Sequence, residues 1–573
     1  MQIKQTETNL PKTVFLKIFL SLMVLAPVAA FSQTTYLPKD DKQNILLERM
    51  EIKGQKDSVF NFSQTRPLSR KYFIQRMMDA YYHPDPALSV VDKYNLRSMM
   101  LNNQEYLNHT DVRSNEFKSK RPLARNYYQT PANLYEAHVK DFDLIVNPVI
   151  QYVVSKVQNN DQKLFLNTRG LYVRGKIANK IGYYAYLTDN QERDPAYVQQ
   201  WVNERQAVPG EGYYKTFKTT GYDYFDASGY FTFNITKYID AAFGYDKNFI
   251  GNGYRSLFLS DFSNNTLFLK LNTRIWKLNY QNLFMELHPA EPRGPDRLLK
   301  KKYAVMHHLD VNVSKSVNVG LFEGVIFGRP DHFEFGYLNP IIFYRSIEQQ
   351  NGSFDNAVAG LDVKANIKKS FQVYGQLLID EFLLSEIKKN RGWWANKWGI
   401  QLGAKYIDAF GIKNLDLQLE HNRVRPFTYS HNDSVANYTH YNQPLAHPLG
   451  ANFSEFIGIA RYQPAPKWLM VAKAIYYQQG RDSSSASFGS NIFLPNTPPY
   501  RTGEFGFNIG SGWKTNVTYL SFLLSYELRE NMFLEANTII RRQEAKTLPI
   551  LKQNTSIISF GFRWNMHRRE FDF

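Results

Sequence analysis

Four histidines within one short segment are the residues best suited to metal or hydrolytic chemistry. They are His421, His431, His440 and His447. With Ser454 or Asp433 they could form a hydrolytic site, and His307-His308 lies elsewhere. However, no pair has the i, i+4 spacing of a helical zinc motif, and nothing resembles a nucleophile elbow. Because metal sites need three or more convergent ligands, the pattern favours polar loop histidines and predicts neither a metal ion nor a cofactor.

Adjacent carboxylates at Asp380 and Glu381 are the other candidates for catalysis. On an extended strand, neighbouring side chains point to opposite faces, so the two carboxylates would not converge on one substrate. The pattern favours a structural carboxylate that pairs with an arginine in the interior of the fold. We therefore predict that the chain is not an enzyme.

Arginines beside aromatic residues suggest a third kind of chemistry, the binding of a saccharide. Sugar recognition uses flat aromatic faces together with amide, carboxylate and guanidinium groups. The candidate ligands for a polysaccharide are Arg255, Asp261, Arg345, Asn356, Trp393, Trp394, Arg425 and Tyr429. Arg391 precedes the two tryptophans in the same segment. For Trp393 and Trp394 the alternative is a position in the aromatic girdle of a membrane protein, which their residue type favours.

Strands must position these residues, because apolar and polar side chains alternate from about residue 144 onward. The clearest apolar positions are Leu267, Leu269, Leu271 and Ile275, then Ile400, Leu402, Ala404 and Tyr406, then Leu415, Leu417 and Leu419. The end of the chain repeats the pattern at Ile558, Phe560, Phe562, Trp564 and Met566. At about ten residues per crossing, this period of two predicts an all-β fold, a transmembrane antiparallel β-barrel of about 18 strands. In lipid such a sheet must close, since an open edge leaves backbone groups unpaired.

Composition agrees with a membrane protein that is not helical. The chain has a mean hydropathy of −0.44 and no cysteine, yet 15% of its residues are aromatic. After the first residues there is no apolar stretch of about twenty residues, which a spanning helix would need. A barrel explains both facts, since its lumen is polar while its outer band is rich in aromatic residues. The alternative is an exported soluble β-protein, such as a propeller or a sandwich.

The first part of the chain predicts export and then a helical region. Lys4, Lys12 and Lys17 precede an apolar run that ends near Ala30, so we expect a signal peptide at residues 1–32. Ser69 then precedes apolar residues at helical spacing, and a second helical run follows the break at Asp85-Pro86. We expect a helical region at residues 33–140, in the periplasm against the barrel mouth, with a mere spacer as the alternative. The barrel would occupy residues 141–573.

The net charge of the chain indicates which class of partner it binds. The formal charge is +17, of which the predicted signal peptide carries +2 and the remaining chain +15. This excess of positive charge favours lipopolysaccharide phosphates or an acidic polysaccharide as partners, whereas no compact basic motif for nucleic acid is present.

The connections between strands are expected to be short on one side of the membrane and long on the other. Tight periplasmic turns are expected at 177–180, 236–238 and 368–370. Long extracellular loops, where recognition is expected, fall at 191–220, 251–265, 288–301, 327–357, 380–397, 425–453 and 480–502.

Several of these loops carry a family resemblance. The segments are GYDKNFIGNGYRSLFLSDFSNN (Gly244–Asn265), YLNPIIFYRSIEQQNGSFDNAVAGLDV (Tyr337–Val363), YGQLLIDEF (Tyr374–Phe382) and RPFTYSH with NQPLAHPLG (Arg425–Gly450). In their order along the chain they resemble the Wzi-type capsule-assembly proteins of the outer membrane, within the Bacteroidetes branch that includes the gliding-motility protein RemB. The similarity covers most of the barrel and, less distinctly, the helical start. The chain departs from a standard barrel ending, because His567 and Arg569 occupy positions where apolar residues are usual.

The resemblance implies a surface lectin that holds capsular or exported polysaccharide against the cell, with the outer membrane as its location. The RemB-like branch implies instead a surface component of gliding motility or adhesion. Capsule-export or gliding machinery would then be partners. A further alternative is a passive channel, suggested by a row of polar residues on one face of two expected strands. These are Lys270, Asn272, Arg274, Asn279 and Gln281.

Overall fold

The computed structural model describes residues 35–38, 42–107, 112–158, 160–292, 297–329, 332–341, 343–483, 486–545 and 552–573. The predicted signal peptide, residues 1–32, lies outside the described residues. No helix in the described ranges combines the length and the apolar composition that are needed to cross a lipid bilayer.

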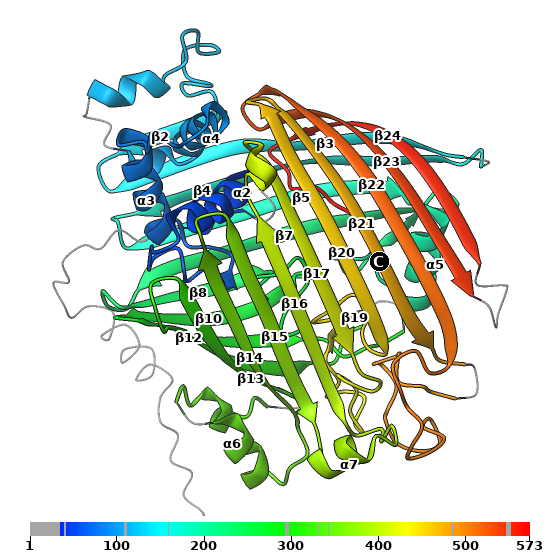
Figure 1. Cartoon of the computed structure of the whole chain (residues 1–573). Helices are drawn as coiled ribbons and strands as arrows, with labels where there is room; N and C mark the ends of the chain where they lie inside the picture. Colours follow the sequence, from blue (N-terminus) through cyan, green and yellow to red (C-terminus); the bar gives the residue numbers. More distant parts are fainter. Residues whose placement is uncertain are drawn as a thin grey trace, which may run out of the picture.

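A closed antiparallel barrel accounts for most of the chain, as the alternating pattern predicted. Within the described part of the chain it has eighteen long strands (Figure 1). They are β3 (Phe142–Val157), β4 (Lys163–Ile177), β5 (Ile181–Arg193), β7 (Gly221–Asn234), β8 (Ile239–Asp246), β10 (Thr266–Ile275), β11 (Leu278–Leu287), β12 (Lys302–Asn312), β13 (Val317–Phe327), β14 (Asn356–Ile367), β15 (Phe371–Glu381), β16 (Lys397–Tyr406), β17 (Leu415–Val424), β20 (Phe453–Ala465), β21 (Trp468–Arg481), β22 (Trp513–Arg529), β23 (Met532–Ala545) and β24 (Gln553–Trp564). The barrel closes where β24 pairs with β3, with Trp564 opposite Ile150.

Alternation along the strands decides which side chains face outward. On β16 and β17, Leu402 and Leu419 are 60% and 67% exposed, whereas Gln401 and Glu420 are buried in the interior. Apolar side chains therefore cover the outer surface and polar side chains fill the lumen. This is the pattern of a transmembrane barrel and the reverse of a soluble protein.

The two ends of the barrel differ in the length of their connections. The turns predicted at 177–180, 236–238 and 368–370 are present at one end, which we call the short-turn end. The long connections lie at the other, the loop end, close to the predicted ranges except that the one after β21 runs on to residue 512. The long connections contain the shorter elements α5 (Ala196–Arg205), β6 (Lys215–Phe217), η3 (Phe335–Leu338) and α6 (Tyr344–Gln350). At the short-turn end, β2 (Tyr135–Val139) precedes β3, and η4 (Ala409–Gly411) lies in the turn between β16 and β17.

Among the described residues, three helices precede the barrel and lie at its short-turn end (Figure 1). They are α2 (Lys42–Gly54), α3 (Arg70–Tyr82) and α4 (Val90–Leu101), followed by the short η1 (Gln104–Tyr106) and η2 (Val112–Phe117). The helix α3 begins after Ser69, as expected, and α4 begins with a capping box between Ser89 and Asp92. Their apolar faces form a core of their own that includes Phe73, Ile74 and Leu96.

Buried ion pairs join this helical region to the barrel wall. The Arg49 guanidinium contacts Asp92, Asp408 and Asp416, the last two of which lie in and after the turn between β16 and β17. The Lys405 ammonium lies 2.6 Å from Glu48, and the Arg174 guanidinium lies 3.0 Å from Glu105. The helices therefore pack against the barrel mouth and are not a mere spacer.

The last strand ends earlier than its sequence pattern predicted. The alternation suggested that the strand runs through Met566, but β24 ends at Trp564 and Asn565 adopts a positive φ of 53°. Residues 565–573 then turn into the barrel, and the C-terminus lies within its outline (Figure 1). The prediction fails because Arg569 and Asp572 find charged partners, Glu192 and Arg255, inside the lumen.

Candidate functional site

The connection after β8 folds into the lumen. Its β9 (Phe249–Ile250) pairs with β1 (Thr65–Arg66) of the helical region. Beyond this pairing, the backbone N–H groups of Tyr254 and Arg255 donate to the Glu420 carboxylate over 2.7 and 3.0 Å. The prediction that residues 251–265 form an extracellular loop is therefore wrong, because lumen side chains satisfy this backbone.

A second connection, between β17 and β20, packs on the first inside the barrel. It contains the short pair β18 (Thr439–His440) and β19 (Gln443–Pro444). The Tyr429 hydroxyl donates to the Leu257 carbonyl over 2.8 Å, and the Tyr438 hydroxyl donates to the Phe258 carbonyl over 2.6 Å. The apolar residues of the two connections share one buried core. The expected extracellular loop 425–453 is thus largely an inner plug, since its apolar side chains are removed from water there.

The C-terminal tail is the third segment inside the lumen. The Asp572 carboxylate lies 3.0 Å from the Arg255 guanidinium and 2.8 Å from the Lys473 ammonium. Burial alone would raise the pKa of Asp572, but the two cations outweigh it and hold this pKa well below its usual range. At the tip of the tail, the Phe573 ring contacts Tyr197 and Trp201, which belong to α5 at the loop end. The C-terminal tail therefore contacts both Lys473 of the barrel wall and α5 in the long connection after β5.

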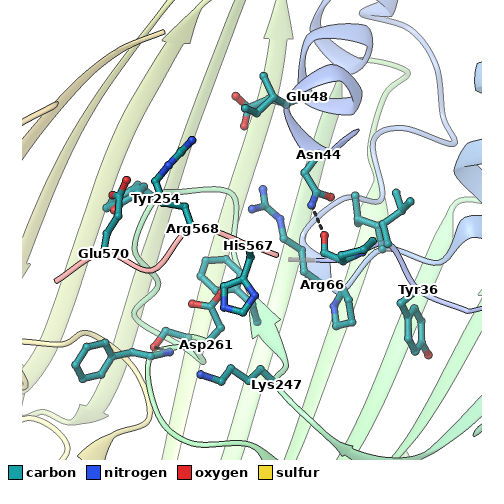
Figure 2. Close-up of a pocket in the computed structure, with 18 of the residues that line it drawn as sticks. Tyr36, Asn44, Glu48, Arg66, Lys247, Tyr254, Asp261, His567, Arg568 and Glu570 are labelled. Carbon is teal, nitrogen blue, oxygen red and sulfur yellow. Dashed lines mark hydrogen bonds between the residues drawn. The ribbon is translucent and has the colours of Figure 1, made fainter. Parts of the chain in front are cut away.

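A chamber of about 440 Å³ lies between these inserted segments. Figure 2 shows side chains of the helical region, the first inward connection and the tail around it: Tyr36, Asn44, Glu48, Arg66, Lys247, Tyr254, Asp261, His567, Arg568 and Glu570. Its volume is in the range of small-molecule sites. Both cations and carboxylates line it, and some of them pair, as Glu48 does with Lys405. The carboxylates in the lining make the chamber a poorer match for a long acidic polymer than a surface of cations and aromatic rings.

Two connections meet at the loop end and present an aromatic and basic surface. The connection after β15 contains α7 (Leu384–Lys389), and the one after β21 reaches residue 512. We define the outer patch as Arg391, Trp393, Trp394, Arg501, Glu504 and Phe505. Three backbone hydrogen bonds join the two connections, from Trp394 to Glu504, from Gly506 to Arg391 and from Phe507 to Gly392, at 2.9 to 3.1 Å. The patch therefore has a fixed backbone.

A glycine permits this close approach. Gly392 has a φ of +69°, a left-handed conformation that favours glycine. A Cβ atom at this position would lie 2.9 Å from the Phe507 nitrogen. A side chain here would force the two connections apart.

Guanidinium groups stack on aromatic rings within the outer patch. Arg501 lies 4.2 Å from the ring centroid of Trp394, and Arg391 lies 4.1 Å from that of Phe505. The Trp394 indole donates to Glu504 over 2.7 Å, and the hydrogen bond from Arg501 helps to lower the pKa of Glu504. Trp394 is thus held in place, while the side chains of Arg391 and Phe505 are about half exposed to water. Such a surface offers both kinds of group that saccharide recognition uses.

Of the eight residues predicted to bind polysaccharide, three lie together at the outer patch. Trp393 and Trp394 are members of it, with ring centroids 6.4 Å apart. Arg425 supports it from below, since its guanidinium donates to the carbonyls of Trp393 and Phe507 over 3.1 and 3.0 Å.

The other five predicted residues lie elsewhere. Arg255 and Tyr429 donate hydrogen bonds inside the lumen, to the carbonyls of Asp572 and Leu257. Asp261 lines the chamber (Figure 2). Arg345 pairs with Glu348 within α6, and the Asn356 amide donates to the Ala436 carbonyl. The structure thus does not bring the eight residues into one site, and a role in binding stays a prediction for each.

The histidine segment does not form a common site. Burial lowers the pKa of His440 to about 3, and its Nδ1 accepts from the backbone N–H of His288 over 3.0 Å. His447 Nε2 lies 2.7 Å from the Glu455 carboxylate. His421 is on β17 and stacks on an outward-facing ring rather than lying in a loop. The different locations exclude convergence of these histidines on one ligand.

Both carboxylates of the Asp380-Glu381 pair approach one cation. The Lys397 ammonium lies 3.8 Å from Asp380 and 3.5 Å from Glu381. The register between β15 and β16 shifts between Ile379 and Glu381, so the simple rule of opposite faces fails here. The partner is a lysine rather than the arginine that we expected, and Asp380 also accepts a hydrogen bond from the Tyr429 backbone N–H.

Sequence reasoning missed the second half of the outer patch. Arg501, Glu504 and Phe505 were not among the candidates, although Tyr500-Arg501 repeats the Tyr-Arg pair seen at Tyr254-Arg255 and Tyr344-Arg345. That repeated pair is a weak signal, because the other two pairs lie outside the outer patch. What could not be seen is the pairing of this segment with residues 391–394.

Comparison with known proteins gives a likeness of fold. No family model matches the chain, and no curated protein matches its sequence. Among solved structures, the chain is similar to Wzi of Escherichia coli, described as an outer-membrane protein involved in group 1 capsule assembly and as a carbohydrate-binding β-barrel. The TM-score is 0.56 at 12% identity, over 94% of this chain and all of that one. The shared feature is the β-barrel fold.

Other solved barrels are more distant. OprD of Pseudomonas aeruginosa has a TM-score of 0.41 at 10% identity, over 74% of this chain and 95% of that one. OccAB2 of Acinetobacter baumannii has a TM-score of 0.42 at 9% identity, over 74% of this chain and 98% of that one.

Proposed function

We propose that this protein is an outer-membrane β-barrel that binds an acidic surface or capsular polysaccharide at its outer patch and holds it at the cell surface. The observation that carries the proposal is the fixed aromatic and guanidinium surface at the loop end, with Arg391 stacked on the half-exposed Phe505. The likeness of fold to the carbohydrate-binding barrel Wzi supports it.

The chemistry of the outer patch fits this class of ligand. A pyranose ring can stack its apolar face on Phe505 or on the partly exposed Trp393. A uronate carboxylate or another acidic substituent can then accept a bidentate hydrogen bond from Arg391. The formal charge of +17 would also attract an anionic polymer from a distance.

The double variant Arg391→Gln, Trp393→Ala should bind acidic polysaccharide roughly 30-fold more weakly than the wild type. The two lost contacts are worth about 1 kcal/mol each, and a tenfold change in affinity corresponds to about 1.4 kcal/mol. Binding is measured with the purified barrel by retention on immobilised capsular polysaccharide of the host. Trp394 is left intact because it holds the patch together.

The matched control is Arg297→Gln, which removes an exposed arginine from a different long connection. It should retain wild-type binding. Equal retention of all three proteins, or no retention of any host glycan by the wild type, would refute the proposal.

A role in gliding follows only from the family resemblance, as do capsule-export or gliding machinery as partners. A deletion strain separates the two roles. Loss of capsule with normal surface spreading supports polysaccharide retention, whereas attached capsule with lost spreading supports the gliding role.

The barrel should not conduct ions steadily in planar lipid bilayers. The polar row proposed for a channel serves other contacts: the Arg274 guanidinium donates to the Val59 carbonyl of the helical region over 2.7 Å, and the Lys270 ammonium donates to Asn248 over 3.1 Å. In addition, the two inward connections form a buried apolar core within the lumen. Single-channel recordings check this, with a known porin as positive control. Uniform unitary steps after most insertions would contradict it.

A further inference from the structure

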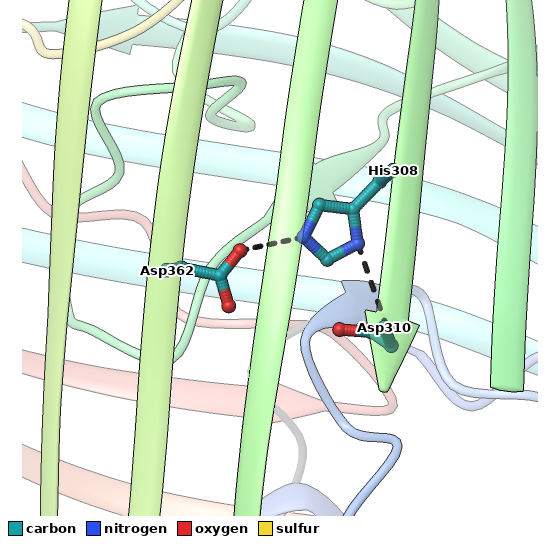
Figure 3. Close-up of side chains that lie close together, drawn as sticks. All are labelled: His308, Asp310 and Asp362. Carbon is teal, nitrogen blue, oxygen red and sulfur yellow. Dashed lines mark hydrogen bonds and ion pairs between the residues drawn. The ribbon is translucent and has the colours of Figure 1, made fainter. Parts of the chain in front are cut away.

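Three titratable side chains meet on the inner side of the barrel wall, apart from the outer patch and the chamber. His308 and Asp310 are two positions apart on β12, and Asp362 lies on β14 (Figure 3). His308 Nε2 lies 2.6 Å from Asp362 Oδ2, and His308 Nδ1 lies 3.5 Å from Asp310 Oδ2. One ligand atom from each residue lies within 4.8 Å of the others, and all three residues are buried. The cluster therefore joins two strands that are not neighbours.

A glycine on the strand between them makes this possible. Gly320 on β13 is opposite both Asp310 on β12 and Asp362 on β14. A Cβ atom on Gly320 would lie 2.2 Å from Asp362 Oδ2. Because Gly320 leaves this space open, the Asp362 side chain can cross β13 and reach His308.

The cluster is short of both hydrogen bonds and positive charge. His308 Nδ1, Asp310 Oδ1 and Asp362 Oδ1 are inaccessible to water and have no hydrogen-bond partner among the described residues. No described lysine or arginine lies within 4.0 Å of either carboxylate, and Arg274 acts on Asp310 only from a greater distance. Two carboxylates and one imidazole carry a net charge of −1 even when the ring is protonated, and such a buried charge is costly without a counter-ion.

We propose that His308, Asp310 and Asp362 bind one divalent transition-metal ion that ties β12 to β14 across β13. One imidazole nitrogen and two carboxylate oxygens are a ligand set that suits Zn²⁺ or Mn²⁺, and two carboxylates neutralise the charge of the ion. Each carboxylate has an unused Oδ1 that can turn to the ion. The Asn279 amide donates to Asp310 Oδ2 over 3.1 Å and orients that ligand from behind. The role is structural, and the site is independent of polysaccharide binding.

Metal content of the full-length purified barrel tests the site. The protein is stripped with a chelator, equilibrated with Zn²⁺ or Mn²⁺, separated from free metal and measured by mass spectrometry. The wild type should retain one equivalent, whereas Asp362→Asn and His308→Gln should lower the affinity by ~100-fold or more. The matched control is His447→Gln, which removes a similarly buried histidine next to a single carboxylate, Glu455. It should retain the metal.

Equal binding by the wild type and Asp362→Asn, or no binding by the wild type, would overturn the proposal. Folding of each variant is checked by its heat-modifiable gel mobility. If neither cluster variant folds, pulsed electron paramagnetic resonance of Mn²⁺ bound to the wild type tests whether an imidazole nitrogen is a ligand of the ion. Coupling to one imidazole nitrogen is expected, and a spectrum without nitrogen coupling overturns the site.

Discussion

Replacing Asp572 by asparagine should lower the free energy of unfolding by about 3 to 5 kcal/mol. Asp572 accepts from the Tyr254 hydroxyl and lies within 3.0 Å of both the Arg255 guanidinium and the Lys473 ammonium. The substitution keeps the shape of the side chain but removes its charge. Of the carboxylates that the structure describes, Arg255 then keeps only Glu455, at 3.6 Å, and Lys473 keeps only Glu570 as a charged partner. Removing one member of a buried ion cluster typically has this cost.

Urea unfolding in detergent, followed by intrinsic fluorescence, measures the effect of Asp572→Asn. The control is Lys301→Gln, which removes an exposed ion pair with Glu286 and should change the free energy by about 1 kcal/mol at most. We also expect the tail of Asp572→Asn to become accessible to carboxypeptidase. A variant as stable as the wild type, with a protected tail, would show that the tail is not anchored by this cluster.

Replacing Arg49 by methionine should release the helical region from the barrel mouth, at a cost of about 3 to 5 kcal/mol. The Arg49 side chain is 4% exposed and contacts three carboxylates, Asp92, Asp408 and Asp416. Lys53 can still pair with Asp92 and Asp408, but it makes no contact with Asp416 in the described structure. Limited proteolysis should therefore cut the variant before residue 140 while the barrel stays intact.

The control for Arg49→Met is Arg76→Gln, whose exposed guanidinium pairs with Asp57 within the helical region. It should leave the protease resistance unchanged, because exposed ion pairs contribute about 1 kcal/mol or less. Identical cleavage of both variants and the wild type would contradict a docking role for Arg49.

Acid should release the helical region of the wild type from the barrel mouth. Burial alone would raise the pKa of Glu48, Glu105 and Asp408, but their cationic partners outweigh it and lower each pKa to about 2. Because the folded pKa lies below the unfolded value of about 4, the stabilisation is present above pH ~4 and is lost as the pH falls towards 2. Protease sensitivity of the helical region should rise over that interval, and less steeply in Arg49→Met.

Much of the fold could be predicted because it depends on neighbouring residues. The two-residue period at Leu415, Leu417 and Leu419 predicted an outward strand face, and the structure confirms it. The spacing after Ser69 likewise predicted the helix α3. Long segments between the strands predicted most of the connections to within a few residues, although the one after β21 runs ten residues further than predicted.

The candidate site was only partly predictable. Trp393, Trp394 and Arg425 were found because tryptophan and arginine are typical of saccharide sites, but Arg501 and Phe505 belong to a segment about a hundred positions further along the chain. Arg255 was chosen for its type and its place in a long connection. Its actual partner, Asp572, is 317 positions away, and no local pattern indicates that contact.

The sequence by itself determined a closed barrel of about eighteen strands with apolar outer faces, a helical start and long connections at one end. Only the tertiary structure decided that two of these connections and the C-terminal tail turn inward, that the outer patch forms from two segments, and that His308 meets Asp362 across Gly320. The physical reason is that side-chain alternation is set by residues two apart. Inward folding is set by apolar contacts, buried charges and hydrogen bonds between residues far apart in the chain, which acquire partners only when the barrel closes around them.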